Sequence, residues 1–322
     1  MLKQKNELLM PTNRRKFIQQ AALMGGALIT SRSLFASSFI PIDKEEEKLV
    51  ILHTNDVHSR LEPFPMDESK TAGLGGVAGR ADLIRRIRGI EENVLLLDAG
   101  DIFQGTPYFN YFKGEPEMKA MSMMEYDAST LGNHDFDGGM ENFATQQKHA
   151  TFPFINCNYD FTSTPLEGKT IPYKIIQKGK IKVGLLGVGV ELNGLVPDKL
   201  YGNTKYHDPI LRANETADLL HKKGCDIIIC LSHLGDKYTD NKVSDEILAQ
   251  SCYHIDLIIS AHTHRLFEKP RVYSNLNGKE TVVNQVGWAG MYLGRLDYTF
   301  SVGKNKKLAH SDKLIVRGKI IE

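Results

Sequence analysis

The chain has 322 residues, of which 41% are hydrophobic and 25% are charged, and its formal net charge is +1. This composition excludes an intrinsically disordered chain and is sufficient for a large globular core. Residues 1–42 hold six basic residues and one acidic residue, so the rest keeps 34 of the 40 basic and 38 of the 39 acidic residues, a net charge of −4. A mildly acidic protein lacks the basic field that binds polymeric nucleic acid, and a nuclease acting on long polymers is therefore disfavoured.

The N-terminal segment has the pattern of an export signal. The adjacent residues Arg14 and Arg15 are followed by an uncharged stretch over residues 21–31 and by small residues over 36–38. This order resembles a twin-arginine (Tat) signal peptide. The uncharged stretch is shorter than the roughly 20 apolar residues that cross a bilayer, so no membrane span is expected after processing. A basic amphipathic helix of a cytosolic protein is the alternative.

This signal suggests how the chain is divided. We expect residues 1–42 to be the signal peptide and linker, and residues 43–322 to form a single catalytic domain. The protein would then be periplasmic, or otherwise exported by the Tat pathway.

Short runs rich in Val, Ile and Leu alternate with helical or loop segments along the remaining chain. Continuous apolar runs of this length are typical of strands buried on both faces in α/β proteins. We expect strands over residues 49–52, 94–97, 152–155, 181–188, 227–231 and 257–259.

The helices and the end of the chain follow from other patterns. Apolar spacing predicts helices over residues 77–87 and 210–220, and Gly224 provides a stop for the second. Two closing strands are expected over residues 281–286 and 292–302, separated by a glycine-containing turn.

The four cysteines show no metal-binding spacing such as C-x-x-C. Cys225 and Cys230 bracket an apolar run, which indicates core positions, the commoner environment of free cysteine. A disulfide also fits an oxidising compartment, but the four cysteines, which include Cys157 and Cys252, permit several pairings and the sequence does not choose one.

Polar residues of a particular kind gather directly after apolar runs, five times along the chain. The clusters are Asp56 with His58, Asp98 with Asp101, Asn133 with His134 and Asp135, Ser232 with His233, and His262 with His264. Ligands of open α/β sheets bind beyond the carboxyl ends of the strands, so these clusters should converge. We expect them to form one metal site.

Each cluster also has a simpler explanation when it is taken alone. His58 fits a solvated turn, Asn133 fits an ordinary turn that needs positive φ, and the pair His262 and His264 also fits an exposed surface. Their joint occurrence favours the metal site. The open alternative is a site that has been lost or has degenerated.

The ordered motifs D-x-H, G-D-x-x-Q-G, G-N-H-D, S-H and H-T-H resemble the calcineurin-like metallophosphoesterase superfamily over residues 49–300. The segments 53–58, 100–105, 132–137 and 293–296 are similar to the catalytic domain of the 5′-nucleotidase family. The resemblance implies a four-layer α/β sandwich in which helices flank two mixed β-sheets. It also implies hydrolysis of a phosphate monoester, with a nucleotide as the favoured substrate.

The resemblance further implies two divalent metal ions. One ion would be held by Asp56, His58 and His264, the other by Asn133, His233 and His262, and the carboxylate of Asp101 would bridge them. Imidazole and oxygen ligands without thiolate suit Zn, Mn, Fe or Co and do not distinguish among these metals. Metals that share a carboxylate lie about 3.5 to 4 Å apart, which is close enough to hold a water molecule between them and to lower its pKa. The resulting hydroxide would attack phosphorus.

Further residues receive roles by the same resemblance. His134 would face the substrate and stabilise phosphate charge or protonate the leaving alcohol, and Asp137 would orient its ring. Asp98 and Gln104 are candidates to support the ligands, whereas His53, inside a strand, is expected in the core.

The chain departs from the family pattern at two positions near the ligands. Ala261 replaces the usual Gly before the H-T-H motif, and Asp135 replaces the usual Glu. We expect Ala261 to leave the ligands unaffected. We also expect the change from Glu to Asp135 to have little effect.

A larger departure concerns substrate binding. Nucleotidases of the family usually carry a second, C-terminal domain that holds the base between aromatic rings, and this chain ends at Glu322. Either a separate polypeptide supplies that domain or the enzyme acts on other or more varied phosphate esters. The alternatives in function are a cyclic-nucleotide or dinucleotide phosphodiesterase and a non-catalytic, metal-bound subunit of a split nucleotidase.

Overall fold

The computed structural model describes residues 46–67, 70–301 and 305–318. The expected signal peptide lies outside the described residues. Among the helices that the structure describes, none combines the length and apolar character needed to cross a membrane.

Two large mixed β-sheets form the centre of the domain. The seven-stranded sheet has the order β15-β14-β1-β2-β3-β4-β6, and its strands are β1 (Glu47–Thr54), β2 (Val94–Asp98), β3 (Ala128–Ser129), β4 (Phe154–Ile155), β6 (Thr170–Ile171), β14 (Tyr292–Phe300) and β15 (Lys306–Ile315). Strands β1 to β6 of this sheet pair in parallel, whereas β14 and β15 are antiparallel.

The six-stranded sheet has the order β12-β13-β11-β10-β8-β7. Its strands are β7 (Tyr173–Lys178), β8 (Ile181–Gly189), β10 (Ile227–His233), β11 (Leu257–Ile259), β12 (Arg271–Ser274) and β13 (Glu280–Asn284). The four inner strands are parallel and the two edge strands are antiparallel to their neighbours. A small third sheet pairs β5 (Tyr159–Asp160) with β9 (Lys205–Tyr206).

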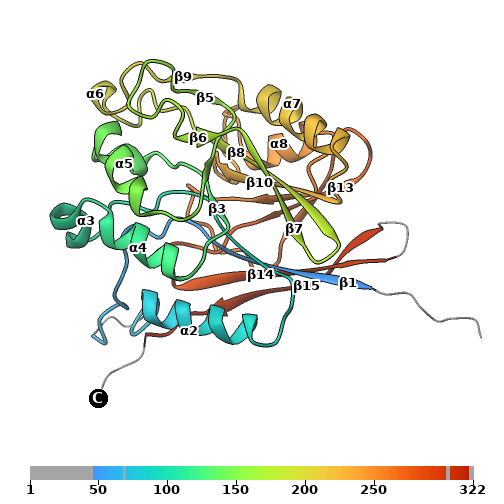
Figure 1. The fold of residues 1–322 in the computed structure, drawn as a ribbon, viewed down its shortest axis with the longest axis horizontal. Coiled ribbons are helices and arrows are strands. Elements are labelled where there is room, and N and C mark those ends of the chain that lie inside the picture. Colours follow the sequence, from blue (N-terminus) through green and yellow to red (C-terminus); the bar gives the residue numbers. More distant parts are fainter. Residues whose placement is uncertain (1–45, 68–69, 302–304, 319–322) are drawn as a thin grey trace, which may run out of the picture. The chain divides into compact units, whose positions relative to one another are not determined.

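Side-chain alternation along β1 divides the core into layers. Leu49 and Ile51 pack between the two large sheets, and Val50 and Leu52 pack against helices on the outer face. This outer face is covered by α2 (Val77–Arg88), α4 (Glu115–Met123) and α5 (Met140–Gln146), while α7 (Pro209–Lys222) and α8 (Asp245–Ser251) cover the six-stranded sheet (Figure 1). The expected four-layer α/β sandwich is therefore confirmed.

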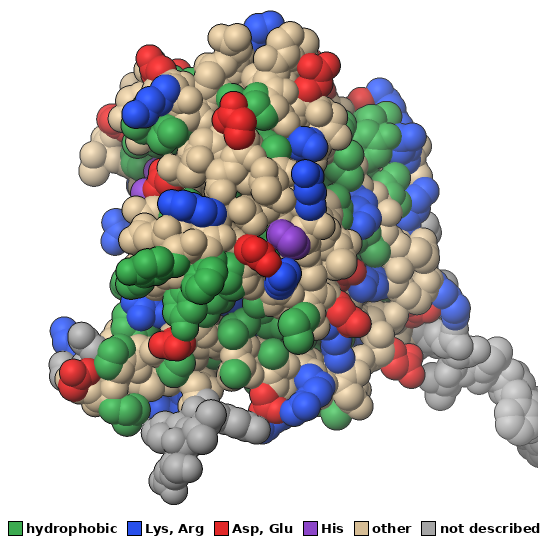
Figure 2. Space-filling model, turned by 60° about the vertical axis from the view of Figure 1, so that its left-hand side comes forward, with side chains coloured by type: hydrophobic (Ala, Val, Ile, Leu, Met, Phe, Trp, Pro, Cys, Tyr) green, Lys and Arg blue, Asp and Glu red, His purple; other side chains and the backbone are tan. Residues whose placement is uncertain are grey.

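The remaining short helices connect these layers. They are α3 (Pro107–Phe112), α6 (Asp198–Tyr201) and the 3₁₀ turns η1 (His134–Phe136) and η2 (Gln147–His149). On the face in Figure 2, which carries α3, α4 and α5, side chains of both charge signs are interspersed among hydrophobic groups. The exposed hydrophobic residues of this region include Tyr111 and Met123.

The predicted elements differ from the structure in a few places. The strand expected over residues 152–155 is shortened to β4, because Pro153 has no N–H to donate and contributes only its carbonyl, to the N–H of Ser129. Strand β15 was not predicted, because it is a largely exposed edge strand without an apolar run. Cys230 is buried in the core, as expected, whereas Cys225 is only partly buried. The described cysteines are free thiols.

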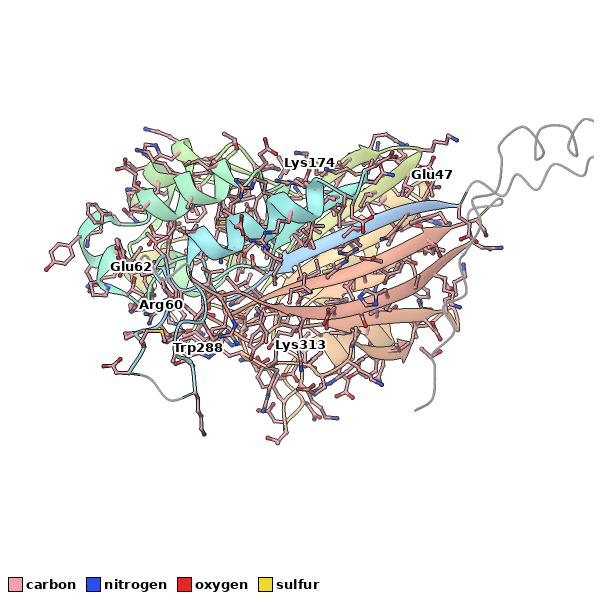
Figure 3. The ribbon with its side chains drawn as sticks, turned by 90° about the horizontal axis from the view of Figure 1, so that it is seen from below. Glu47, Arg60, Glu62, Lys174, Trp288 and Lys313 are labelled. Atoms are coloured by element: carbon pink, nitrogen blue, oxygen red, sulfur yellow. The ribbon has the colours of Figure 1, made fainter. Side chains whose placement is uncertain are left out.

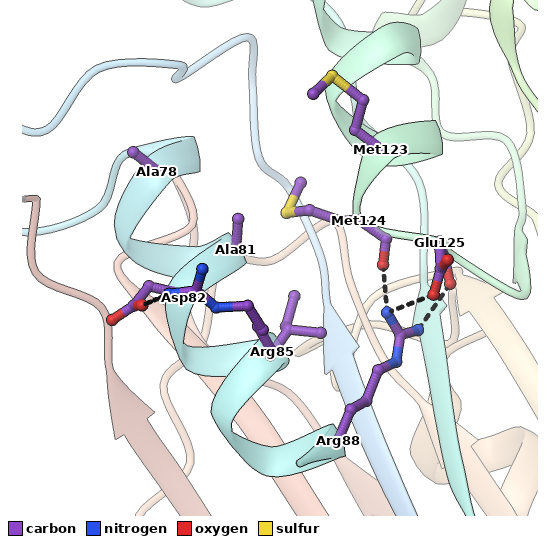
Figure 4. A pocket seen from close by; sticks show the side chains of 9 residues that line it. Ala78, Ala81, Asp82, Arg85, Arg88, Met123, Met124 and Glu125 are labelled. Atoms are coloured by element: carbon purple, nitrogen blue, oxygen red, sulfur yellow. Dashed lines mark hydrogen bonds and ion pairs between the residues drawn. The ribbon is translucent and has the colours of Figure 1, made fainter.

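A surface cavity of about 490 Å³ lies between α2 and the end of α4 (Figure 4). Arg88 closes one side of it by donating hydrogen bonds to the carbonyls of Met124 (2.7 Å) and Glu125 (2.8 Å) at the C-terminus of α4. A cation at this position satisfies carbonyl groups that the helix leaves unpaired. None of the predicted site residues lines this cavity.

Candidate metal centre

The residues predicted to bind metal converge at the carboxyl ends of the central strands. Their ligand atoms form two groups, and within each group these atoms all lie within 4.8 Å of one another. The groups are Asp56, His58, Asp101 and His264, and Asp101, His233 and His262. Asp101 thus belongs to both groups, so one carboxylate lies between two sets of ligands.

The distances within the first group are short. The Nε2 atoms of His58 and His264 lie 2.9 Å apart, and His264 Nε2 lies 3.6 Å from Asp56 Oδ1. His58 Nε2 lies 3.8 Å from Asp101 Oδ2. In the second group, His233 Nε2 lies 3.1 Å from the same Asp101 oxygen. Several lone pairs therefore point into one small volume, as metal coordination requires.

Backbone carbonyls select the tautomer of two of these histidines. His58 Nδ1 lies 3.1 Å from the carbonyl oxygen of Gln104, and His233 Nδ1 lies 2.8 Å from that of Ala99. Because a carbonyl can only accept a hydrogen bond, each Nδ1 carries the proton and donates it. When the ring is neutral, each Nε2 then has a lone pair directed at the centre, which is the form of histidine that binds metal.

Asn133 borders the second group. Its neighbour His134 donates a backbone hydrogen bond to Asp101 Oδ1 at 2.8 Å, which places this loop against the shared carboxylate. The Oδ1 atom of Asn133 is buried and has no hydrogen-bond partner among the described residues. Leaving a buried acceptor unpaired is costly, and a metal ion at this position would satisfy it.

The backbone at the centre is strained. Left-handed φ values occur at five of the seven predicted ligands, namely Asp56 (50°), His58 (52°), Asp101 (56°), His262 (69°) and His264 (54°). Residues other than glycine rarely adopt such values, and they persist where the surrounding structure imposes them, often at functional sites. The strain arises where each strand turns sharply, which aims the side chains inward.

Burial shifts the pKa values of three of the predicted ligands. It lowers the pKa of His262 to about 3 and that of His264 to about 4, so both imidazoles are neutral at pH 7 and able to bind metal. Burial also raises the pKa of Asp56 to about 8. Two carboxylates in one buried centre repel each other, so positive charge between Asp56 and Asp101 would stabilise both.

His134 and Asp137 lie at the opening of the centre. Their Nδ1 and Oδ2 atoms are 2.8 Å apart, and the side chain of His134 is 42% exposed. The hydrogen bond to Asp137 raises the pKa of His134, although burial opposes this shift. The His134 ring also meets the edge of the His58 ring, with centroids 5.3 Å apart. His134 is therefore held beside the ligands while it remains accessible to a bound molecule.

Residues 49–266 match the family model described as calcineurin-like phosphoesterase. This chain belongs to the calcineurin-like phosphoesterase family. The snake venom 5′-nucleotidase of Naja atra is 34% identical to it over 295 residues, which are 85% of this chain and 54% of that protein. The 2′,3′-cyclic-nucleotide 2′-phosphodiesterase/3′-nucleotidase of Haemophilus influenzae is 30% identical over 334 residues, which are 95% of this chain and 50% of that protein.

A solved structure of a 5′-nucleotidase precursor from Thermus thermophilus superposes with a TM-score of 0.74 at 32% identity. The match covers 84% of this chain and 55% of that one. The resemblance to the catalytic domain of 5′-nucleotidases is thus confirmed. The chain spans about half the length of the curated relatives it matches.

Sequence reasoning missed the main role of Asp135. Its buried carboxylate accepts four backbone hydrogen bonds, from the N–H groups of Asp101 (3.1 Å), Ile102 (2.9 Å), Phe103 (3.2 Å) and Gly132 (2.8 Å). Asp135 therefore joins the loop after β2 to the loop after β3. The sequence signal that could have indicated this role was the position of Asp135, an acidic residue two positions after the predicted ligand Asn133.

Other residues singled out in the sequence have defined places in the structure. Asp98 accepts hydrogen bonds from Thr54 Oγ1 (2.6 Å) and Ser129 Oγ (2.9 Å), which ties three neighbouring strands together near the ligands. The side chain of Gln104 is exposed, and it is the backbone carbonyl of this residue that meets His58.

His53 lies in the core, as expected. Its Nε2 is 2.9 Å from Asn284 Nδ2, and a Cβ atom on Gly294 would come within 2.1 Å of the same ring nitrogen. This close approach explains the glycine of the L-G-R-L motif. Ala261 does not have a left-handed φ, so the glycine that the family usually places there is not required by the backbone.

Proposed function

We propose that this chain is a phosphomonoesterase that hydrolyses nucleotide monophosphates or related phosphate esters with two divalent metal ions. The observation that carries the proposal is the position of Asp101, which belongs to both ligand groups. Two-metal phosphoesterases hold their ions about 3.5–4 Å apart, and a shared carboxylate suits that separation. The activities named for the relatives support the same class of reaction.

The proposed ligands divide into two sets that meet at Asp101. Asp56, His58 and His264 would hold one ion, and Asn133, His233 and His262 would hold the other. The imidazoles and the unpaired amide oxygen fit divalent cations such as Zn, Mn, Fe or Co. When bound, the ions supply positive charge to the phosphate and lower the pKa of the water that attacks phosphorus.

His134 is proposed to act on the substrate. Its ring lies at the opening of the centre, where the phosphate ester would enter, and its Nδ1 is engaged by Asp137. The Nε2 side of the ring is then directed to stabilise charge on the phosphate or to give a proton to the leaving alcohol. Asp137 orients the ring and favours the protonated form.

The test is to remove bound metal from the purified protein with a chelator and to add back Mn or Zn. AMP hydrolysis should be lost and then regained, with activity also measured on other phosphate monoesters. Hydrolysis that survives complete metal removal would contradict the proposal. Tight metal binding without turnover of any ester would instead indicate a non-catalytic subunit.

A phosphodiesterase of the same fold is a second candidate. It is favoured by the Haemophilus influenzae relative, whose name joins a cyclic phosphodiesterase activity with a nucleotidase activity. Parallel rates on AMP and on 2′,3′-cyclic AMP separate the two functions. A faster rate on the cyclic substrate would make the diesterase reaction the main one.

Export by the Tat pathway is proposed from Arg14 and Arg15 and the segments that follow them. Residues 1–42 fused to a reporter protein should carry the folded reporter out of the cytoplasm. Replacing both arginines by lysine should stop this export while the reporter is still made. Unchanged export of the variant would exclude the Tat signal.

A further inference from the structure

The single tryptophan of the chain lies beside the metal centre. The indole ring of Trp288 is parallel to the imidazole of His264, with ring centroids 5.7 Å apart and an interplanar angle of 5°. The residue is 38% exposed, although tryptophan is among the side chains that gain most from burial. An accessible aromatic ring therefore lies directly beside the imidazole of a predicted metal ligand.

A second ring and a cation extend this surface. Phe64 meets Trp288 edge to face, with centroids 5.9 Å apart and an angle of 74°. The guanidinium of Arg60 lies 4.1 Å from the centroid of the Phe64 ring. Arg60 and Trp288 lie on the same side of the domain in Figure 3. We call Arg60, Phe64 and Trp288 the aromatic rim.

The loop that carries Trp288 is fixed to the loop of the first ligand. The side chain of Asn55 accepts a hydrogen bond from Val286 N–H (3.1 Å) and donates one to the carbonyl of Gly287 (2.6 Å). The N–H of Ala289 donates to the carbonyl of Asp56 at 2.7 Å. The loop of Trp288 is thus held in a set position relative to the metal centre, which is the property of a preorganised binding surface.

The charges near the rim favour a neutral aromatic group as its ligand. Arg60 is the cation of the rim, and the carboxylate of Glu62 lies two residues further along the chain, where it accepts a hydrogen bond from the hydroxyl of Tyr108 at 2.6 Å. The opposite charges limit any attraction for a second phosphate group. The exposed indole ring and the partly exposed phenyl ring instead offer surfaces on which a planar heterocycle can stack.

We propose that the aromatic rim binds the planar base of a nucleoside monophosphate while its phosphate lies at the metal centre. The inference rests on the proposed phosphomonoesterase function and names the class of leaving group, a nucleoside with an aromatic base. The rim would then select nucleotides over sugar phosphates. A purely structural Trp288, packed only to orient His264, is the competing explanation.

The position of Trp288 allows a direct test that does not depend on turnover. The emission of this one tryptophan in the metal-loaded protein is followed while adenosine is added, with excitation at a wavelength that adenosine does not absorb. Saturable quenching by adenosine, absent with ribose, is expected. The Phe64→Leu variant should need a higher adenosine concentration to reach half of the maximal quenching. Emission that does not respond to adenosine would overturn the proposal.

Kinetics give an independent readout. The ratio of kcat/KM for AMP to that for ribose 5-phosphate should fall by about tenfold in Trp288→Ala, as expected for the loss of one stacked base. The matched control is Tyr111→Ala, which removes an exposed aromatic ring outside the rim and should leave the ratio unchanged. Equal losses on both substrates in Trp288→Ala would mean that Trp288 acts only through His264, and would contradict base binding.

These outcomes are distinct from failure of the proposed function. If the wild-type protein hydrolyses neither substrate, the phosphomonoesterase proposal fails. The fluorescence titration then still decides whether the rim binds an aromatic base.

Discussion

The carboxylate of Asp135 accepts a hydrogen bond from the backbone N–H of Asp101, at 3.1 Å. The residue that two ligand groups share is therefore held in place by a neighbour that is not itself a predicted ligand. The same carboxylate reaches the N–H of Gly132 at 2.8 Å, so the loops after β2 and β3 are positioned together. The geometry of the metal centre depends on this junction.

Asp135→Ala should weaken metal binding, because four buried N–H groups lose their acceptor at a cost of about 1–3 kcal/mol for each group left unpaired. Asp135→Asn keeps one acceptor oxygen and should have a smaller effect. Metal content after dialysis against a weak chelator, together with circular dichroism to confirm folding, measures this. Folded Asp135→Ala protein that retains metal as well as the wild type would show that the junction is unimportant.

Asp101→Asn and His134→Ala should affect different properties, namely metal retention and turnover. Loss of the shared carboxylate charge should reduce metal retention, because Asp101 belongs to both ligand groups. His134→Ala should keep its metal and slow the turnover of AMP by about 10²- to 10⁴-fold, the usual contribution of a general acid or base. Metal analysis beside steady-state kinetics separates the two. Equal metal loss in both variants would contradict this division of roles.

Asp137→Asn should slow turnover less than His134→Ala does. Asp137 acts through the 2.8 Å contact with His134 Nδ1, so its effect depends on the histidine ring. The double variant should be no slower than His134→Ala alone, because residues that act as a unit are not additive. The measurement is kcat for the wild type, the two single variants and the double variant, which together form a double-mutant cycle. Independent, additive losses would show that Asp137 has a separate function.

Asp245, at the start of α8, gives a prediction for the pH dependence of stability. Burial raises its pKa to about 7 from an ordinary value of 3.8, although Ser232 donates a hydrogen bond to it. Between these values the folded state holds a proton that the unfolded state has lost. The contribution of Asp245 to the stability of the folded state is therefore complete below about pH 4 and is lost as the pH rises towards 7.

Asp245→Asn cannot ionise, so its stability relative to the wild type should rise across this window, by about 2–4 kcal/mol. Urea unfolding of both proteins at pH 4.5 and pH 7.5, with chelator present throughout, measures the difference. The control is Asp160→Asn, because hydrogen bonds from Thr162 lower the pKa of Asp160 and it stays ionised over this range. A constant difference between Asp245→Asn and the wild type would rule out a buried, protonated Asp245.

The polar clusters illustrate how much of the site could be predicted from the sequence. The apolar run before Asp56 predicted strand β1, and the side chains after it were expected at the edge of a sheet, where the structure has them. The types of ligand followed from residue chemistry. The core position of His53 followed from its place within a strand. All of these features depend on residues that are close together in the chain.

The relationships across the site depend on tertiary structure. The sequence alone does not place Trp288 parallel to His264, since these residues come from different loops that Asn55 and the strand pairing bring together. It also gave no reason to expect the four hydrogen bonds of Asp135, whose partners lie up to 34 residues away. Local sequence determined the α/β class, most of the buried strands and the polar clusters that follow them, because side-chain periodicity and strand ends are local properties. Only the tertiary structure decided which hydrogen bonds hold Asp101 in place and which rings surround the ligands, because sheet register and loop packing are set by contacts between distant segments.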